Sequence, residues 1–480
     1  MSTSPHPADT TLAAASTGTS VDALVGSALA AGRRHGADDV VVVVRRTDAT
    51  NLRWAANQLT TTGTTSTTSL GVVVVRDREQ GRAYGGLTRQ VSDLAGVERL
   101  VADAAAAAGR ADVAEDAAPL VAGPVSADFA DEPSEASPER LSATARELGE
   151  LFAASQAAGR EMFGFAEHRT TTTWTATSAG TRHRAVEPFG TVELNGKSHG
   201  RSRSAWAGTG TRDFTDVDVH ALAGEVLQGL QWQGRRVDVA PGRHRVVLSP
   251  SASADVLGEW LFSADARTAA DGRGVFARPG GGTRLGERLT DARLTVRDDP
   301  GHPLLGTSDV VSATSTDAFG SVFDTGLVVP GTRFLDAGVL GGLVSSRHTA
   351  GLAGVPVSPW AGNLLVDLAG GEGSTADLVA RTGDGLLITC LWYVRTVDEQ
   401  TMLMTGLTRD GVYVVRGGEV VGATSNFRFN DSPAAMLTRV RDAGAPQVCL
   451  PRELGDHLPR AQAPALAVED FHLSSVSEAS

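Results

Sequence analysis

Two uninterrupted runs of valine place the strongest constraint on how this 480-residue chain can fold. The first run is Val40–Val44, which follows two aspartates, and the second is Val72–Val75, which ends at an arginine. β-branched side chains favour extended backbone, and a run without polar alternation is typical of a strand that is buried on both faces. We therefore predict two buried strands, which other parts of the chain must cover.

Two amphipathic segments are suited to cover these strands. Ser20 is placed to cap a helix, and a second helix is expected from about 92 to 108. Each has one apolar stripe, formed by Val21, Leu24, Val25, Ala28 and Leu29 in the first and by Leu94, Val97, Leu100, Val101 and Ala104 in the second. The threonine-rich stretch 58–70 between the strands suits an exposed strand pair or a mobile hairpin, and we favour a solvated β edge.

Turn residues and composition divide the rest of the chain. We expect a disordered tail at 1–19, an N-terminal α+β domain at 20–120 and a central α+β domain at 121–238. An acidic stretch rich in Ala and Pro, 111–137, marks the boundary between the two domains. Residues 239–480 are expected to form a large, mostly-β domain that includes a hairpin turning at Gly417-Gly418. The predicted class is α+β, with N-terminal α/β units of mixed sheet and packed helices.

Composition excludes several classes of function. The net charge of -13 opposes binding to a phosphate backbone, so no nucleic-acid partner is expected. No apolar run approaches the roughly 20 residues that cross a bilayer, and the first residues do not resemble a secretion signal, so we expect a cytoplasmic protein without membrane contact. The two cysteines, Cys390 and Cys449, have no zinc-site spacing.

Local motifs for catalysis are weak. The 11 histidines are spread singly, and no HExxH, GxSxG or P-loop pattern occurs. Four polar segments are candidate functional sites, but the residues of each are more typical of a structural role. They are a basic loop at 196–208, a Gly-rich loop at 277–286, a turn at 298–300 and a strand entry with an internal ion pair at 409–411.

Several ordered segments beyond residue 240 carry a family pattern. The segments PGRHRVVLSPSASADVLGEWL, GRGVFARPGGGTRLGERLTDARLTVRDDP and GLLITCLWYVRTVDEQTMLMTGLTRDGVYVVRGGEVVGATSNFRFNDS follow one another over 241–432. In these segments the chain resembles the TldD/PmbA family of metallopeptidase-related proteins, and QLTTTGTTSTTSLGVVVV in the N-terminal part is compatible with it. The resemblance extends over nearly the whole chain.

The resemblance also implies where a metal site would lie. Active members carry HExxxH on the helix that follows the segment matching Val246–Pro250, and a C-terminal cysteine completes the site. Placed on this sequence, the pattern puts its histidines at Gly258 and Ser263, its glutamate at Glu259 and its cysteine near Cys449. Both imidazoles are absent, so we expect no metal or other cofactor in this chain.

The missing ligands place the chain in the TldE/PmbA-like branch. The resemblance implies a metal-free subunit that pairs with a TldD-type, HExxxH-bearing subunit, where zinc or iron is expected. Together they would form a heterodimeric chamber that cleaves small or unfolded peptides, including precursors of peptide natural products. One alternative is a stand-alone homodimeric peptide-binding protein without hydrolase activity. Another is a repurposed enzyme with Glu259 as a metal-free general base, although an interface contact or an evolutionary remnant suits Glu259 better.

Overall fold

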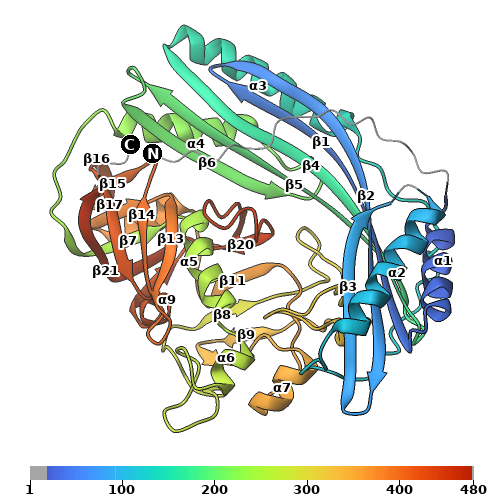
Figure 1. The fold of residues 1–480 in the computed structure, drawn as a ribbon. Helices are drawn as coiled ribbons and strands as arrows, with labels where there is room; N and C mark the ends of the chain where they lie inside the picture. The colour runs from blue at the N-terminus through green and yellow to red at the C-terminus, as the bar shows by residue number, and fades with distance from the viewer. Residues whose placement is uncertain (1–18, 92, 478–480) are drawn as a thin grey trace.

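The computed structural model describes residues 19–91 and 93–477, so the tail expected at 1–19 lies almost wholly outside it. The N-terminal half forms one long, curved sheet of six strands in the order β3-β2-β1-β4-β5-β6 (Figure 1). The strands are β1 (Asp39–Ala55), β2 (Gln58–Arg78), β3 (Gly81–Gln90), β4 (Arg160–Thr177), β5 (Arg182–Ser198) and β6 (Arg203–Thr211). Every neighbouring pair is antiparallel, where a mixed sheet was expected.

The expected boundary near residue 120 does not divide this sheet. β1 and β4 pair in unbroken register from Val41↔Thr177 to Trp54↔Gly164, which joins the segments on either side of the boundary. The stretch 111–137 between them is largely irregular but packed, since Ala114, Ala117, Ala118 and Leu120 lie against the core. The two N-terminal units therefore share one sheet.

Four helices cover one face of the sheet. They are α1 (Val21–Arg34), α2 (Leu94–Arg110), α3 (Ser142–Ala157) and α4 (Val219–Trp232). The predicted Ser20 cap is confirmed, because its side chain accepts a hydrogen bond from the backbone N–H of Ala23 at 3.3 Å. α1 and α2 pack over one end of the sheet, and α3 and α4 pack over the other end.

The first valine run is buried on both faces, as predicted. Val40, Val42 and Val44 pack beneath α1 and α2, whereas Val41 and Val43 pack against Val322 and Phe323 from the C-terminal half. A run of apolar residues without polar alternation thus indicates a strand that is covered on both faces. The C-terminal half lies within the curve of the sheet, with α1, α2 and α3 on the outer side (Figure 1).

The segment expected to be a basic loop, 196–208, is instead the hairpin of β5 and β6. Small residues at its buried positions hide the strand pattern, because α4 lies close to the sheet here. A Cβ on Gly196 would come within 2.4 Å of Val226 Cγ1, and a Cβ on Gly229 within 2.9 Å of Ala205 Cβ. Glycine and alanine thus stand where larger apolar residues would have indicated a strand.

The C-terminal half contains two mixed sheets. In the larger, the order is β13-β14-β17-β21-β7-β12-β15-β16, and β18 pairs with β21. Its strands are β7 (Gly242–Leu248), β12 (Gly385–Ile388), β13 (Leu391–Asp398), β14 (Leu403–Thr408), β15 (Val412–Arg416), β16 (Glu419–Ala423), β17 (Asn426–Asp431), β18 (Val440–Ala443) and β21 (Leu466–Ser477). The predicted hairpin is confirmed, with Gly417 and Gly418 at φ 56 and 82.

The smaller sheet has the order β10-β9-β8-β11-β20-β19. Its strands are β8 (Leu294–Arg297), β9 (Arg333–Asp336), β10 (Val339–Leu340), β11 (Leu364–Leu368), β19 (Gln447–Cys449) and β20 (Ala461–Ala463). The helices of this half are α5 (Pro250–Phe262), α6 (Ala266–Ala270), α7 (Arg347–Ala353), α8 (Thr375–Thr382) and α9 (Pro433–Met436).

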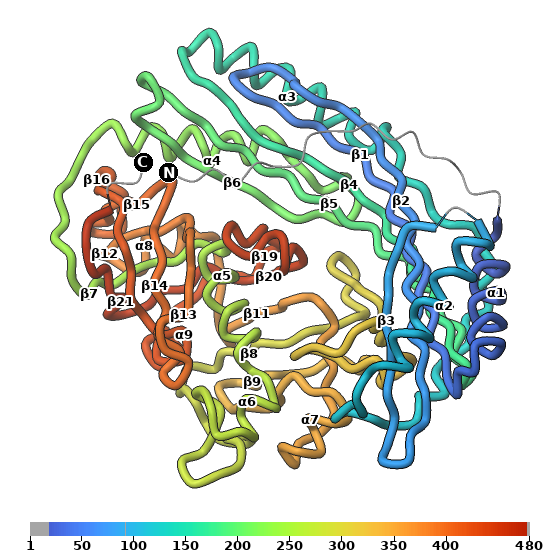
Figure 2. The backbone as a smooth tube through the Cα atoms, in the orientation of Figure 1, coloured from blue at the N-terminus to red at the C-terminus, as the bar shows by residue number. Residues whose placement is uncertain are grey.

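The α+β class is confirmed, with a mostly-β C-terminal half. α5 contacts β7, β11, β19, β20 and α9, so it joins the two C-terminal sheets (Figure 2). Among the described residues, no helix has the length and apolar character that a membrane crossing requires.

Close packing of β3 on α2 yields a stability prediction. A Cβ on Gly85 would lie 2.3 Å from the Ala104 carbonyl oxygen and 2.4 Å from the Ala108 nitrogen. Since backbone atoms cannot yield as a side chain can, we expect Gly85→Ala to destabilise the protein by about 1–3 kcal/mol. Gly26 on α1 has open space around it, and Gly26→Ala should stabilise by about 0.5–1 kcal/mol. Thermal unfolding of both variants measures this, and equal effects would contradict it.

Candidate functional site

Helix α5 carries two of the four residues that the family motif singles out, Gly258 and Glu259, and a third, Ser263, is its C-cap. Ser249 caps it by accepting a hydrogen bond from the Ala252 N–H at 3.2 Å, and Pro250 occupies the first turn, where its missing N–H costs no hydrogen bond. Eleven of its 13 residues are buried. Any polar group on this helix is therefore held in the protein interior or at its border.

The buried carboxylate of Asp255 holds a loop against α5. It accepts hydrogen bonds from the backbone N–H groups of Arg452, Glu453 and Leu454 at 3.2, 3.0 and 3.1 Å. Burial raises the pKa of Asp255 well above its ordinary value, while the three N–H groups act in the opposite direction. Sequence reasoning missed Asp255. Its one local signal was its position four residues before Glu259, in a helix with no other charged residue.

Glu259 lies one helical turn further on, at the border of the interior. Burial raises its pKa to about 7; the charge of Glu453 adds to the shift, and that of Arg395 opposes it. A carboxyl group with a pKa near neutrality can hold or release a proton under physiological conditions. General acid–base catalysis also requires a substrate within hydrogen-bonding reach, and a structural carboxyl group in a buried cluster shows the same shift.

The same loop joins α5 to the edge strand β13. The Glu453 carboxylate accepts hydrogen bonds from the backbone N–H groups of Tyr393 and Val394 at 2.9 and 3.0 Å, and it pairs with Arg395 at 3.0 Å. β13 is the outermost strand of its sheet. Glu453 therefore satisfies backbone groups that would otherwise be open to an added strand.

Arg452 connects this cluster to the N-terminal sheet. Its guanidinium donates to Glu193 of β5 at 3.0 Å and lies over two indole rings, with its Cζ 4.7 Å from the centroid of Trp392 and 5.3 Å from that of Trp206. The Trp206 indole N–H also donates to Glu193 at 3.0 Å. Three adjacent residues, 452–454, thus join α5, β13 and the N-terminal sheet.

The four motif positions do not meet at one point. A Cβ on Gly258 would lie 2.6 Å from Leu454 Cδ1 and 2.8 Å from Leu458 Cδ2, so leucine side chains fill the space of the first histidine. Ser263 is the C-cap, and its hydroxyl donates to the Glu259 carbonyl at 3.0 Å. The Cys449 thiol lies 3.5 Å from the carbonyl oxygen of Pro250, in the first turn of the helix. Pro250 precedes Gly258 by eight residues, which is about 12 Å along the helix axis.

These groups do not fit a divalent metal ion. Glycine has no donor, the serine hydroxyl is engaged with backbone, and burial raises the pKa of Cys449 to about 12, far from the thiolate that binds metal. Within 19–91 and 93–477, no group of three or more His, Cys, Asp or Glu side chains is arranged to hold a metal. No chemical step through a metal can be derived from these positions.

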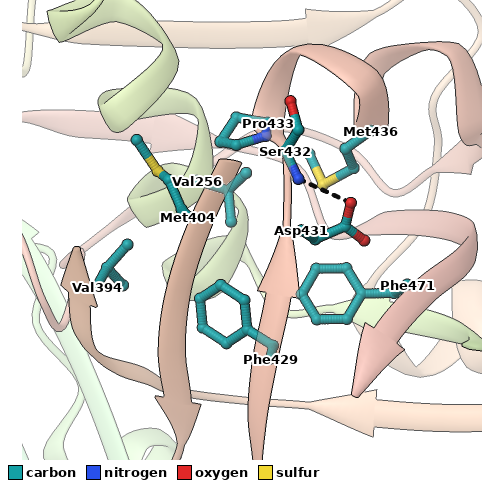
Figure 3. Close-up of a pocket in the computed structure, with 9 residues that line it drawn as sticks. All are labelled: Val256, Val394, Met404, Phe429, Asp431, Ser432, Pro433, Met436 and Phe471. Carbon is teal, nitrogen blue, oxygen red and sulfur yellow. Dashed lines mark hydrogen bonds between the residues drawn. The ribbon is translucent and has the colours of Figure 1, made fainter. Parts of the chain in front are cut away.

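A small cavity lies beneath α5, between Val256 and the larger C-terminal sheet (Figure 3). Its volume is about 10 Å³, room for about one water molecule. The figure shows Phe429 and Phe471 on one side and Met404, Pro433 and Met436 around the other. The Asp431 carboxylate at its border is paired with Arg439 at 2.6 Å. This space is a packing defect rather than a ligand site.

Two of the segments for which a structural role was expected, 298–300 and 409–411, make structural contacts. The Asp298 carboxylate accepts backbone hydrogen bonds from Thr332 and Ala361, both at 2.6 Å, which organises the turn that follows β8. Asp410 pairs with Arg409 at 3.7 Å and accepts a hydrogen bond from Ser204 of β6 at 2.6 Å. Asp410 therefore adds a second contact between the two halves of the chain.

Residues 241–475 match the family model described as PmbA/TldA metallopeptidase C-terminal domain. The chain belongs to the TldD/PmbA family. The fold is similar to that of TldE from Thermococcus kodakarensis, with a TM-score of 0.75 and 15% identity over 94% of this chain and 100% of that chain. No curated protein matches the sequence.

Two further solved structures share the TldD/PmbA fold over 94% of this chain, and both are described as proposed modulators of DNA gyrase. The one from Bacteroides thetaiotaomicron has a TM-score of 0.71 at 13% identity and is covered to 98%. The one from Thermotoga maritima has a TM-score of 0.70 at 16% identity and is covered to 99%. At such identities the likeness establishes the fold, while function depends on the residues of the site.

The raised pKa of Glu259 predicts a pH-dependent stability. Its pKa rises from 4.5 to about 7 on folding, so its contribution to stability is complete below pH 4.5 and is lost as the pH rises through 7. Glutamine does not titrate. The free energy of unfolding of Glu259→Gln, relative to that of the parent, should therefore increase by on the order of 2 kcal/mol from about pH 4 to about pH 8. Thermal unfolding across this range tests the shift. Glu79→Gln, in an exposed turn, is the control, and parallel curves for Glu259→Gln would refute the prediction.

Packing at the two histidine positions predicts unequal tolerance. Gly258→His must displace Leu454 and Leu458, so we expect a loss of about 3 kcal/mol. Ser263→His loses one hydrogen bond at a partly exposed helix end and should cost less than about 1 kcal/mol. Chemical denaturation of the two variants provides the comparison. Similar stabilities would show that the space beside Gly258 is not filled as described.

Proposed function

We propose that this protein is a metal-free, TldE/PmbA-like subunit of a heterodimeric peptidase. Its partner is a TldD-type subunit that carries HExxxH and a zinc or iron ion. Together they form a chamber in the cytoplasm that cleaves small or unfolded peptides, including precursors of peptide natural products. The present chain contributes structure and substrate enclosure, and the hydrolytic chemistry takes place in the partner.

The packing of Gly258 carries this proposal. The chain retains the helix on which active family members present their metal ligands, with its cap, its buried faces and its glutamate. At the position of the first histidine, however, leucines 454 and 458 occupy the space of a side chain. The interior is packed here without space for an imidazole, which supports a non-catalytic role for this helix.

The anchoring of the 452–454 loop supports a structural part for this chain. Asp255 and Glu453 use their carboxylates to hold backbone N–H groups, and Arg452 connects to Glu193 across the two halves of the protein. Such contacts keep α5 and β13 in fixed positions relative to the curved sheet. A rigid wall of this kind would enclose a peptide and support the metal-bearing helix of the partner.

Reconstitution tests the proposal. The chain is purified alone and together with a TldD-type protein from the same genome, and each sample is assayed for bound metal and for digestion of unfolded peptides. We expect a stable complex, metal in proportion to the partner, and cleavage by the complex alone. Stoichiometric zinc or iron with peptide cleavage by the isolated chain would overturn the proposal, and failure to co-purify with the partner would favour a stand-alone peptide-binding protein.

A variant of Glu259 separates a structural role from a catalytic one. Glu259→Gln in the reconstituted complex should leave kcat and KM unchanged within about twofold, because the proposed chemistry lies in the partner. Mutating the HExxxH glutamate of the partner to glutamine is the matched control and should abolish cleavage. A loss of kcat for Glu259→Gln, with the complex still assembled, would instead support the general-base alternative.

A further inference from the structure

A pocket of about 520 Å³ lies at one end of the N-terminal sheet. Small-molecule sites in proteins have volumes of roughly 300–1,000 Å³. Three connections form its wall: the turn between β1 and β2, the connection from α3 to β4, and the β5–β6 hairpin. The lining residues lie within 56–58, 156–161 and 197–201. None of them belongs to the C-terminal half, so the pocket is separate from the candidate site at α5.

Two sets of hydrogen bonds hold the walls of this pocket in place. The Asn57 side chain accepts a hydrogen bond from the Met162 N–H at 2.8 Å and donates to the Arg160 carbonyl at 2.7 Å, which fixes the β1–β2 turn against β4. The Arg201 guanidinium donates twice to the Glu161 carboxylate, at 2.7 and 3.3 Å, and connects the β5–β6 hairpin to the same strand. The pocket is therefore preformed, so little ordering of the protein opposes binding.

Positive charge exceeds negative charge around the pocket. Arg160, Lys197 and Arg201 line it, and Glu161 is the one acidic lining residue. Arg201 pairs with Glu161, whereas Arg160 and Lys197 form no ion pair within 19–91 and 93–477. α3 ends beside the pocket, and its terminal carbonyl groups add about half a negative charge, which does not offset two cations. In a chain with a net charge of -13, a pocket with two unpaired cations is suited to an anion.

Lys197 is the only lysine among the 43 lysine and arginine residues of this chain. It lies on β5 opposite Glu161 of β4, and its Nζ is 5.9 Å from the centroid of the Phe163 ring. An ammonium group is a compact charge with three rotatable donors, whereas a guanidinium group presents its donors in a fixed plane. Lys197 and Arg160 together can therefore donate to several oxygens of one phosphate group.

The remaining lining groups select a polar ligand. The amide groups of Gln58 and Gln156 form no side-chain hydrogen bond in the described part of the chain, so both can bind hydroxyl groups. No aromatic side chain lines the pocket, so a nucleobase has no ring to stack on. A phosphate group alone would fill only a small part of the 520 Å³. The ligand that fits therefore combines a phosphate group with a hydroxyl-rich body.

We propose that this pocket binds a sugar phosphate, with the phosphate group between Lys197 and Arg160 and the sugar hydroxyl groups beside Gln58 and Gln156. Lys197 belongs to the basic segment 196–208, whose sequence alone favoured a structural role. The residues that complete the pocket lie far from this segment along the chain. The inference does not rest on the proposed peptidase function, because every lining residue lies in the N-terminal half.

Acetylation of Lys197 tests the pocket directly. The primary amines of the chain are Lys197 and the amino terminus, and mass spectrometry separates their products. Ribose 5-phosphate and glucose 6-phosphate are compared with ribose, glucose and inorganic phosphate on the full chain. At least one ester should slow the acetylation of Lys197 about tenfold at about ten times its Kd. Acetylation of the amino terminus is the internal control and should not change.

The other ligands determine what the pocket recognises. Ribose and glucose should give no protection, and inorganic phosphate should protect less than the better ester does. Absence of protection by both esters at millimolar concentration would overturn the proposal. Protection by ribose or glucose would show that the cations do not select the ligand, and equal protection by inorganic phosphate would show that the sugar makes no contact. Either result would also overturn it.

Substitutions test the two cations separately. We expect Arg160→Gln and Lys197→Gln each to raise the Kd of the protecting ester about tenfold in calorimetry, because each removes a charge-assisted hydrogen bond. Lys197→Arg keeps the charge and should have a smaller effect. Arg110→Gln, at the exposed end of α2, is the matched control and should leave the Kd unchanged. An unchanged Kd in both pocket variants, or a comparable loss of affinity in Arg110→Gln, would contradict the assignment.

Discussion

The buried carboxylate of Asp255 is the constraint on which the candidate site depends. A carboxylate removed from water is unfavourable unless hydrogen-bond donors surround it, and the three donors here are consecutive backbone N–H groups of one loop. Backbone donors are available only if that loop takes one particular conformation. This conformation places Leu454 against Gly258, Glu453 along β13 and Arg452 beneath the N-terminal sheet. One carboxylate therefore determines what packs beside Gly258, along β13 and against the N-terminal sheet.

Local sequence patterns predicted the elements whose conformation is set by residues within the element itself. The valine runs, the Ser20 cap and the Gly417-Gly418 turn were all recognised because side-chain branching, capping and positive φ act within a few residues. The β5–β6 hairpin was missed because its buried positions hold Gly196 and Ala205. Their small size is explained by α4, which crosses the sheet closely at that point. The sequence shows that these side chains are small, but it does not show the packing of α4 that requires them to be small.

The candidate site shows the same division. The missing histidines at Gly258 and Ser263 could be found by comparing the sequence with a family motif. The role of Asp255 could not, since its partners lie almost 200 residues further along the chain and contribute backbone rather than side-chain groups. The separation of Cys449 from Gly258 was also hidden, because a motif match does not show that Cys449 contacts the first turn of α5 while Gly258 lies about two turns further along. Membership of the TldD/PmbA family thus fixes the scaffold, and the packing determines what the scaffold can do.

The position of β21 has a consequence for how the protein is made. This strand contains residues 466–477, yet it lies between β17 and β7 inside the larger C-terminal sheet. β7 leads directly into α5, so the core around that helix stays open until more than 200 further residues have been synthesised. Contacts so distant in sequence form slowly and leave apolar surface exposed in the meantime. A nascent chain of this fold would therefore be a natural client for chaperones, and a nonsense mutation late in the gene would be as damaging as an early one.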